Sequence, residues 1–250
     1  ILVFDGTWWG LKQTPTKERL NAVFARNEQD IIAVGAQGSI LRSQGLVWFH
    51  EDIPQKLQGV SWWAVHGVGS AWWLSGEAGL WSFDGESFQL LLGDEGGRPQ
   101  RVRGLWSASA DSAWIAGEGG LLRRWGPAGF ESFDVPGGDL LGLAGTHNAD
   151  VWAVGETGRI LHFDGLSFFE YLPLTDQTLR AVHAVSEDNA WAVGDGGVVL
   201  HWDGQSWSHH TQVEHIDLRA VGVNVDGALM VGGLPVLVVR PFLPIPEAVN

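Results

Sequence analysis

The chain of 250 residues is 45% hydrophobic and 18% charged, so it has enough apolar residues to bury a large core. This length fits one large or two small domains. The net charge of −14 argues against a nucleic-acid partner and against anionic membrane surfaces, because no basic stripe is available to bind phosphates. The absence of cysteine excludes disulfides and zinc–thiolate sites.

The N-terminal stretch ILVFDGTWWG lacks the basic flank of a signal peptide, and no run of 18 apolar residues predicts a membrane-spanning helix. We therefore expect no membrane insertion. The first residues look like the middle of a folded unit, so we expect a mature or trimmed chain. The lack of cysteine leaves the compartment open, and we slightly favour an extracytoplasmic or cell-surface location.

A motif repeats along the chain about every 40 residues, and each copy contains a glycine that follows a strand-like run such as WAV. Residues 1–8, ILVFDGTW, match only the second half of this repeat, as it stands in ILHFDGLSF at 160–168. The repeat glycines follow at Gly35, Gly76, Gly117, Gly155, Gly194 and Gly232. A fixed period in this range is typical of solenoids, propellers and repeat arrays.

The fifth repeat shows which of these architectures applies. It predicts four short strands, at Leu179–Val185, Ala190–Val193, Val198–Trp202 and Ser206–His210, separated by polar or glycine-rich turns. Four strands joined by hairpin turns form an antiparallel meander, which is the blade of a β-propeller.

We predict an all-β fold, a six-bladed β-propeller of four-stranded antiparallel blades that forms a single domain over residues 1–240. A composite blade from both termini would close it, with residues 1–9 completing the blade begun at 216–240, because closure hides two sheet edges. Both ends supply a copy of the third strand, so one copy is in excess. Residues 241–250 form a Pro-rich C-terminal tail.

Each blade repeats the same structural residues. Large apolar side chains before the glycines are expected to pack between blades, at Ile32, Trp73, Trp114, Trp152, Trp191 and Leu229. The repeat glycines are expected to supply the positive φ of tight hairpins. Asp-Gly pairs at 5–6, 84–85, 164–165 and 203–204 predict turns in which the carboxylate caps backbone N–H groups.

The repeats DVWAVGETGRILHFDG and NAWAVGDGGVVLHWDG resemble those of bacterial propellers grouped with the BNR/Asp-box and photosystem II assembly-factor-like propellers. The resemblance covers residues 1–240 and implies the propeller fold. The turn HWDGQSW departs from the Asp-box pattern because Asp and Gly are adjacent. The box is structural in that family, so the resemblance implies no catalytic residue.

Four repeats place a carboxylate directly after the repeat glycine, at Glu77, Glu118, Glu156 and Asp195. One interpretation is a ring that binds a cationic partner or Ca²⁺. The other is that hairpin tips are polar and solvated, and we favour it because tips of neighbouring blades are too far apart to share one ion. We therefore predict no metal site and no required cofactor.

Arginines open the innermost strand of three repeats, at Arg103, Arg180 and Arg219, with Arg101 close by. They would bind a carboxylate, phosphate or sugar acid by bidentate contacts, as the arginine triad of the similar sialidases does. Sialidases also need a Tyr–Glu pair, and the only tyrosine, Tyr171, is adjacent to Glu170 on a strand, so their side chains should point apart. Pairing of the arginines with nearby acids is the interpretation we favour.

The histidines are weaker candidates. His209, His210, Glu214 and His215 would form a metal site only with partners that the sequence does not show, so we favour a solvated loop. A hydrogen bond within each of the pairs His162/Asp164 and His201/Asp203 would stiffen a hairpin. The inward position occupied by His183 is Phe24, Trp106, Ala144 or Gly222 elsewhere, which excludes a symmetric ligand set.

The chain is rich in tryptophan, and tandem pairs occur at Trp8/Trp9, Trp62/Trp63 and Trp72/Trp73. In a strand the two members of a pair face opposite sides, so some rings should be exposed or lie at an extra interface. Exposed tryptophans suit sugar stacking or protein binding, although we expect most of the fifteen to pack between blades.

We predict a non-enzymatic binding or scaffold module with no catalytic residue and with a protein or glycan partner. The partner would dock on the face bearing the turns between strands two and three, through Glu77, Glu118, Glu156, Asp195, Arg103, Arg180 and Arg219. The alternative is a carbohydrate-binding, lectin-like propeller. A second alternative is a glycoside hydrolase of the sialidase type, which needs two carboxylates across a cleft.

Overall fold

A computed structural model describes residues 1–4, 9–27, 29–44, 47–96, 99–210, 216–223, 229–233 and 237–240. Its internal contacts divide the chain into an N-terminal unit, Ile1–Asp134, and a C-terminal unit, Val135–Asn250. Strands dominate both units, and the helical segments among the described residues are single 3₁₀ turns of three residues.

The N-terminal unit holds one short hairpin and three four-stranded antiparallel sheets. The hairpin is β1 (Leu2–Phe4) and β2 (Trp9–Leu11). The first sheet is β3 (Leu20–Asn27), β4 (Asp30–Gly35), β5 (Ile40–Gln44) and β6 (Val47–His50). The second is β7 (Trp62–Val68), β8 (Ala71–Gly76), β9 (Gly79–Phe83) and β10 (Phe88–Leu92). The third is β11 (Val102–Ser109), β12 (Ser112–Gly117), β13 (Leu122–Gly126) and β14 (Gly129–Ser132).

The C-terminal unit holds two four-stranded sheets and one three-stranded sheet, all antiparallel. The fourth sheet is β15 (Leu140–His147), β16 (Asp150–Gly155), β17 (Ile160–Phe163) and β18 (Phe168–Tyr171). The fifth is β19 (Leu179–Ser186), β20 (Asn189–Gly194), β21 (Val199–Trp202) and β22 (Trp207–His209). The last is β23 (Leu218–Val223), β24 (Leu229–Gly233) and β25 (Leu237–Arg240).

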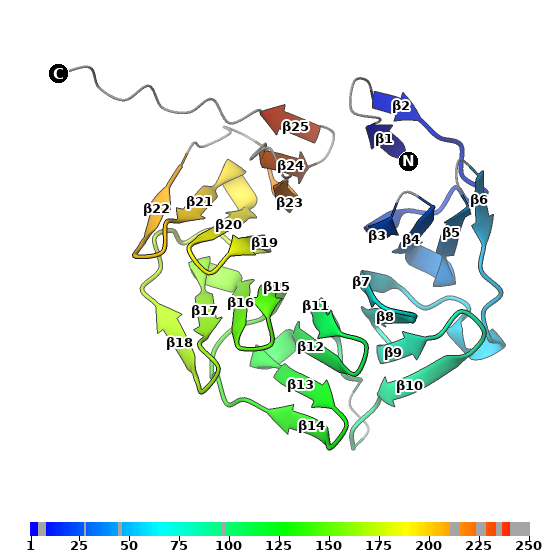
Figure 1. Cartoon of the computed structure of the whole chain (residues 1–250), viewed down its shortest axis with the longest axis horizontal. Coiled ribbons are helices and arrows are strands. Elements are labelled where there is room, and N and C mark those ends of the chain that lie inside the picture. Colours follow the sequence, from blue (N-terminus) through cyan, green and yellow to red (C-terminus); the bar gives the residue numbers. More distant parts are fainter. Residues whose placement is uncertain are drawn as a thin grey trace. The chain divides into compact units, whose positions relative to one another are not determined.

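The predicted meander of four strands is confirmed in five repeats, because each sheet is ordered as its strands follow in the chain. Within each unit the first strands of successive sheets lie side by side, as Figure 1 shows: β3 contacts β7 and β7 contacts β11, and β15 contacts β19 and β19 contacts β23. Successive sheets therefore pack face to face, and one face of each second strand becomes an inter-sheet core.

The predicted inter-sheet side chains are buried. Trp152 joins a cluster with Leu179 and Val182 of the next sheet, and Trp73 joins one with Val102 and Leu105. Ile32, Trp114 and Trp191 are also buried. Burying one such side chain stabilises the fold by about 1.5–3 kcal/mol. The side chain of Leu229 lies outside the described residues.

The two members of the pair Trp72/Trp73 face opposite sides as expected, and both indoles are fully buried rather than exposed. Trp72 faces the first sheet and Trp73 faces the third, so both faces of β8 are covered. In Trp62/Trp63 only Trp62 is fully buried. The side chains of Trp8 and Trp9 lie outside the described residues.

Short strands lie near both ends of the described chain. β1 and β2 pair only with each other among the described strands, and β23–β25 form a sheet of three. Both copies of the third strand, β1 and β25, are therefore present. Asp5-Gly6 and the tail 241–250 lie outside the described residues, and closure of the ring stays a prediction.

Candidate functional site

Each repeat turns from its second to its third strand directly after the repeat glycine. Gly117 and Gly155 are extended, with φ of −173° and −165°, so the expectation of positive φ at these glycines is wrong. Positive φ falls two residues later, at Gly119 and Thr157. The glycine is needed for close approach instead, because a Cβ at Gly117 would lie 2.2 Å from the Arg101 carbonyl oxygen.

The first strand of every sheet carries a β-bulge near its start. The pairing skips one residue, for example from Val102↔Gly117 to Gly104↔Ala116, and so leaves Arg103 unpaired. A bulge re-aims its side chain, and it often does so next to functional sites. The bulge residues are Asn21, Trp63, Arg103, Leu141, Arg180 and Arg219.

The three predicted arginines thus occupy equivalent bulge positions. Sequence reasoning identified them but missed Asn21 and Trp63, because it considered only charge. Their place as the second residue of the first strand is the signal that would have found them.

Arg103 is held between an acid and an aromatic ring. Its Nη2 donates to Glu118 Oε1 at 2.6 Å, and Arg101 Nη1 lies 3.6 Å from the same oxygen. The Arg103 guanidinium also lies 3.7 Å from the ring centroid of Trp63, the bulge residue of the preceding sheet. This cation–π contact joins two neighbouring sheets.

Asn21 extends this arrangement to the first sheet, because its Nδ2 donates to the Trp62 carbonyl oxygen at 2.8 Å. We call Asn21, Trp63 and Arg103 the bulge row. It links three consecutive sheets of the N-terminal unit at the end of the strands where the turns after Gly35, Gly76 and Gly117 lie.

In the fifth sheet, Arg180 binds Asp195 with two hydrogen bonds, Nη2 to Oδ2 at 2.6 Å and Nε to Oδ1. These bonds raise the pKa of Arg180 above its usual value. Arg219 lies 3.9 Å from Asp217, whose Oδ1 accepts a bond from the Gly196 N–H. These contacts match the interpretation in which arginines pair with acids of their own surroundings.

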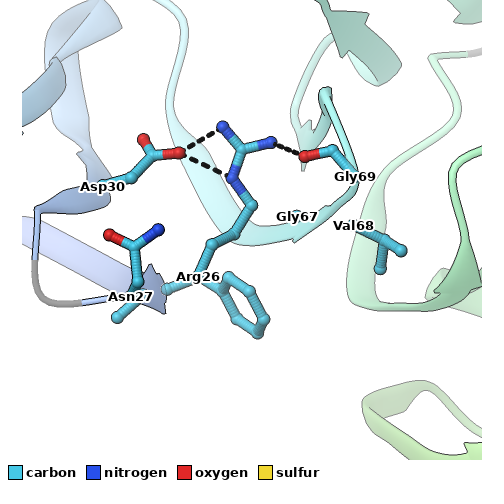
Figure 2. Close-up of a pocket in the computed structure, with 8 residues that line it drawn as sticks. Arg26, Asn27, Asp30, Gly67, Val68 and Gly69 are labelled. Atoms are coloured by element: carbon cyan, nitrogen blue, oxygen red, sulfur yellow. Dashed lines mark hydrogen bonds and ion pairs between the residues drawn. The ribbon is translucent and has the colours of Figure 1, made fainter.

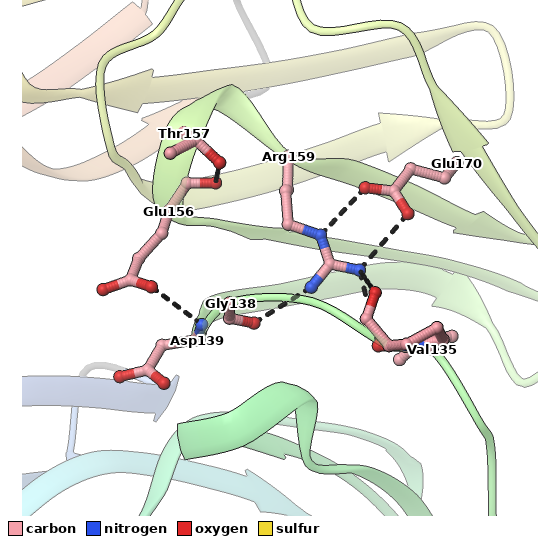
Figure 3. Close-up of polar contacts among 8 residues, drawn as sticks. Val135, Gly138, Asp139, Glu156, Thr157, Arg159 and Glu170 are labelled. Carbon is pink, nitrogen blue, oxygen red and sulfur yellow. Dashed lines mark hydrogen bonds and ion pairs between the residues drawn. The ribbon is translucent and has the colours of Figure 1, made fainter.

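The other two carboxylates bind backbone. Glu77 Oε2 accepts from the Ser61 N–H at 3.1 Å, and Glu156 Oε2 accepts from the Asp139 N–H at 3.0 Å (Figure 3). Each acid thus makes its bonds close to its own turn. Among the described residues, no three His, Asp or Glu side chains gather closely enough to hold a metal ion.

Figure 3 also shows Arg159, a buried arginine that sequence reasoning missed. It donates to both carboxylate oxygens of Glu170 and to the carbonyls of Val135, Pro136 and Gly138. It therefore fastens the connection before β15 to the outer strand β18. Tyr171 instead packs against Trp152 and Trp202, so it and Glu170 do not form a pair.

A pocket of about 440 Å³ opens at the other end of β3 and β7, near the turns that follow these strands. It is lined by residues 24–27, Asp30 and residues 67–69. Arg26 spans it, with its Nε donating to Asp30 Oδ2 at 2.8 Å and its Nη1 to the Gly69 carbonyl (Figure 2). Its guanidinium also lies over the Trp72 ring.

Three aromatic side chains lie together beside this pocket, at equivalent positions of β3, β7 and β11. The rings of Phe24 and His66 are 4.1 Å apart, and those of His66 and Trp106 are 6.3 Å apart. We call these three residues the aromatic row. Burial lowers the pKa of His66 to about 4, so this imidazole is neutral at neutral pH.

Two histidines in the C-terminal unit have other partners than expected. His162 bonds Asp150 at 2.7 Å rather than Asp164, and it stacks on Trp152. Burial alone would raise the pKa of Asp150, but bonds from His162 and Thr146 outweigh it and lower that pKa.

In the fifth sheet, His201 bonds Asn189 and stacks on Trp191 in the same way. The expected partner, Asp203, instead caps the backbone N–H groups of Gln205 and Ser206. Asp84 and Asp164 cap their own turns likewise, which confirms the predicted capping role of these Asp-Gly pairs.

The loop histidines also have separate contacts. His209 Nε2 bonds the Leu174 carbonyl oxygen at 3.0 Å, and the His210 ring lies edge-on to Trp191. Glu214 and His215 lie outside the described residues.

Solved structures with the same fold are known. The structure of YCF48 bound to D1 peptide has a TM-score of 0.76 at 14% identity, covering 95% of this chain and 84% of that chain. Streptogramin B lyase has a TM-score of 0.72 at 15% identity, covering 87% and 77%. The extracellular domain of BT4673 from B. thetaiotaomicron has a TM-score of 0.74 at 13% identity, covering 95% and 35%.

At these identities the likeness shows the fold alone, which is that of β-propeller repeat proteins. No protein-family model and no curated protein matches the chain, so the Asp-box resemblance stays a prediction. None of the helical turns in the described ranges has the length and apolar character needed to cross a membrane.

Proposed function

We propose that this chain is a non-enzymatic binding or scaffold module, a single six-bladed propeller domain over residues 1–240. Residues 1–9 complete the blade that residues 216–240 begin. Five four-stranded sheets supply five blades, and the two-stranded hairpin and the three-stranded sheet supply the sixth blade with one strand in excess. A composite blade would hide the edges of both terminal strands.

The partner docks on the face that bears the turns between strands two and three. The observation that carries this proposal is the bulge row: Asn21 bonds the Trp62 backbone carbonyl and Arg103 stacks on Trp63, so residues at equivalent positions link three sheets. Arg103, stacked on Trp63 and bonded to Glu118, combines the residue types that dominate binding energy in protein interfaces. The proposed contact residues are those bulge arginines and turn acids: Glu77, Glu118, Glu156, Asp195, Arg103, Arg180 and Arg219.

A protein partner is favoured over a glycan by two observations. One similar propeller is solved with a bound peptide. The bulge residues also differ between repeats, from Asn21 to Trp63 to Leu141, whereas a lectin of this shape would repeat one sugar-binding set. A lectin-like propeller stays the alternative, with Trp63 as its stacking surface.

The sialidase-type alternative is disfavoured by two side chains. It needs a Tyr–Glu pair, and Glu170 is bound by Arg159 while Tyr171 packs on Trp152. The proposal uses no metal or cofactor. The location we favour is extracytoplasmic, as is the similar domain of BT4673.

A photo-crosslinking experiment tests the docking face. A benzoylphenylalanine at Arg101, which is half exposed beside Glu118, should crosslink one protein in the cells that make this chain. The same probe at Leu90, on the outer strand β10, is the matched control and should not. Changing Arg103 to Ala should abolish the crosslink.

Two results would contradict the proposal. Equal crosslinking from the probes at Arg101 and Leu90 would show that the partner does not bind specifically on the proposed face. Binding on a glycan array that is lost in a Glu118→Gln/Arg180→Ala variant would replace the protein partner with a sugar.

A further inference from the structure

The outer strand β18 of the fourth sheet and the residues directly before and after it carry an unusual concentration of exposed apolar side chains. Among the described residues, nine large hydrophobic side chains are exposed, and four of them fall within residues 166–174. We call these four the rim strip: Leu166 (89% exposed), Phe169 (54%), Leu172 (90%) and Leu174 (40%). A cluster of this kind marks a binding surface more often than scattered single residues do.

The corresponding strands of other sheets and their described flanking residues lack this cluster. The segments around β6 and β10 expose one such residue each, Val47 and Leu90, and the segment around β14 exposes none. The rim strip is therefore a property of the fourth repeat and not a general consequence of lying outermost.

The backbone of β18 is also open to a partner. In the part of the chain that the structure describes, β18 pairs with β17 alone and is the last strand of its sheet (Figure 1). An edge strand leaves alternate N–H and C=O groups unpaired, and an extended peptide can add to them as a further strand. Arg159 holds this edge in place through Glu170.

Charge indicates what kind of peptide would bind. Residues 160–178 contain the acids Asp164, Glu170 and Asp176; Arg159, directly before them, is bound to Glu170. The C-terminal unit as a whole has four Lys and Arg against fourteen Asp and Glu, a net charge of −10. Such a surface repels a second copy of this chain and attracts a segment with basic residues.

We propose that the rim strip is a second docking surface, which binds an extended apolar segment of a partner protein flanked by Lys or Arg, added as a strand to β18. One apolar residue of that segment would cover Phe169 in β18, another beyond the end of the added strand would cover Leu172, and its basic flanks would lie against Asp164 and Asp176. This surface uses other residues than the bulge row, so the two proposals stand or fall separately.

The test is a selection from a phage-displayed library of random twelve-residue peptides against the purified chain. Enriched peptides should carry apolar residues between basic flanks, and their binding should weaken with salt. The variant Phe169→Ser/Leu172→Ser should lower their affinity about tenfold or more, whereas the matched control Val47→Ser/Leu90→Ser should leave it unchanged. Bound peptide should also slow amide hydrogen exchange in β18.

All four substituted side chains are exposed, and a cooperative urea transition checks that both variants fold. The proposal is overturned by no enrichment, by equal binding to the Phe169→Ser/Leu172→Ser variant, or by unchanged exchange in β18. Two other results would also overturn it: a dimer seen by sedimentation velocity, or binding to phosphatidylcholine vesicles. Either counts if the Phe169→Ser/Leu172→Ser variant abolishes the association, because the rim strip would then bind a second copy of the chain or a lipid surface.

Discussion

The two units repeat the same sheet but use it differently. The N-terminal unit has eleven Lys and Arg against fifteen Asp and Glu, a net charge of −4, and the C-terminal unit has a net charge of −10. All three lysines lie within the first 56 residues. The backbone repeat therefore sets the fold, and the side chains that it leaves free give each unit its own surface chemistry.

The inner strands show the same contrast. In the N-terminal unit, the fifth residue of each first strand belongs to the aromatic row. In the C-terminal unit the equivalent residues are Ala144, His183 and Gly222. Large rings that touch across three sheets restrain them as a group, whereas Ala144 and Gly222 carry no ring with which His183 could form such a row.

The largest expected effect comes from the buried tryptophans of each unit. Trp72→Ala and Trp152→Ala should each lower the free energy of unfolding by about 3–5 kcal/mol, because both indoles are fully buried. If residues 1–240 form one domain, both variants shift the same single transition, measured by circular dichroism in urea and by calorimetry. Two transitions, each shifted by only one variant, would show that the units unfold independently.

The aromatic row predicts a pH dependence specific to the N-terminal unit. Because the pKa of His66 falls to about 4, the unfolded state binds a proton more readily, and stability is lost as pH falls from about 6.5 to 4. The loss should reach up to about 3 kcal/mol. His66→Phe should remove this part of the slope in urea titrations at pH 7, 5.5 and 4.

His66→Asn removes both the titratable group and the ring, so its comparison with His66→Phe, which keeps a ring, separates the titration from the loss of ring packing. If His66→Phe keeps the wild-type slope between pH 7 and 4, the buried imidazole is not the group that titrates.

The close approach of a backbone carbonyl to each repeat glycine predicts that an alanine there has an intermediate effect on stability. Gly117→Ala forces a Cβ onto the Arg101 carbonyl and should cost about 1–3 kcal/mol of stability. Gly126→Ala in the same sheet is the matched control, because no atom lies within 4 Å of its added Cβ. Equal midpoints for the two variants in thermal unfolding would refute the steric explanation.

The smallest effect is expected at the two arginine–acid pairs, one in each unit. Glu118→Gln and Asp195→Asn should each cost less than about 1 kcal/mol, since both pairs are partly exposed and water screens them. The cost should shrink further in 1 M salt. A larger cost for Asp195→Asn that persists in salt would mark that pair as structural rather than available to a partner.

Local features of the fold could be predicted from the sequence. Asp84, Asp164 and Asp203 cap their turns as expected, because an Asp-Gly turn depends only on neighbouring backbone. The burial of Trp152 follows likewise from its place in the repeat. What was missed depends on contacts between distant residues: Trp63 under Arg103, Arg159 on the carbonyls before β15, and Asp150 rather than Asp164 as the partner of His162.

The register shift in each first strand has a practical consequence. It is fixed by the backbone pairing and by the repeat glycine, where a Cβ would clash with a backbone carbonyl. Neither depends on the side chain at the second position of the strand. The chain already tolerates Asn21, Trp63, Arg103 and Leu141 there. The backbone at these positions therefore accepts different side chains. Substituting them together could give the same scaffold a new binding specificity.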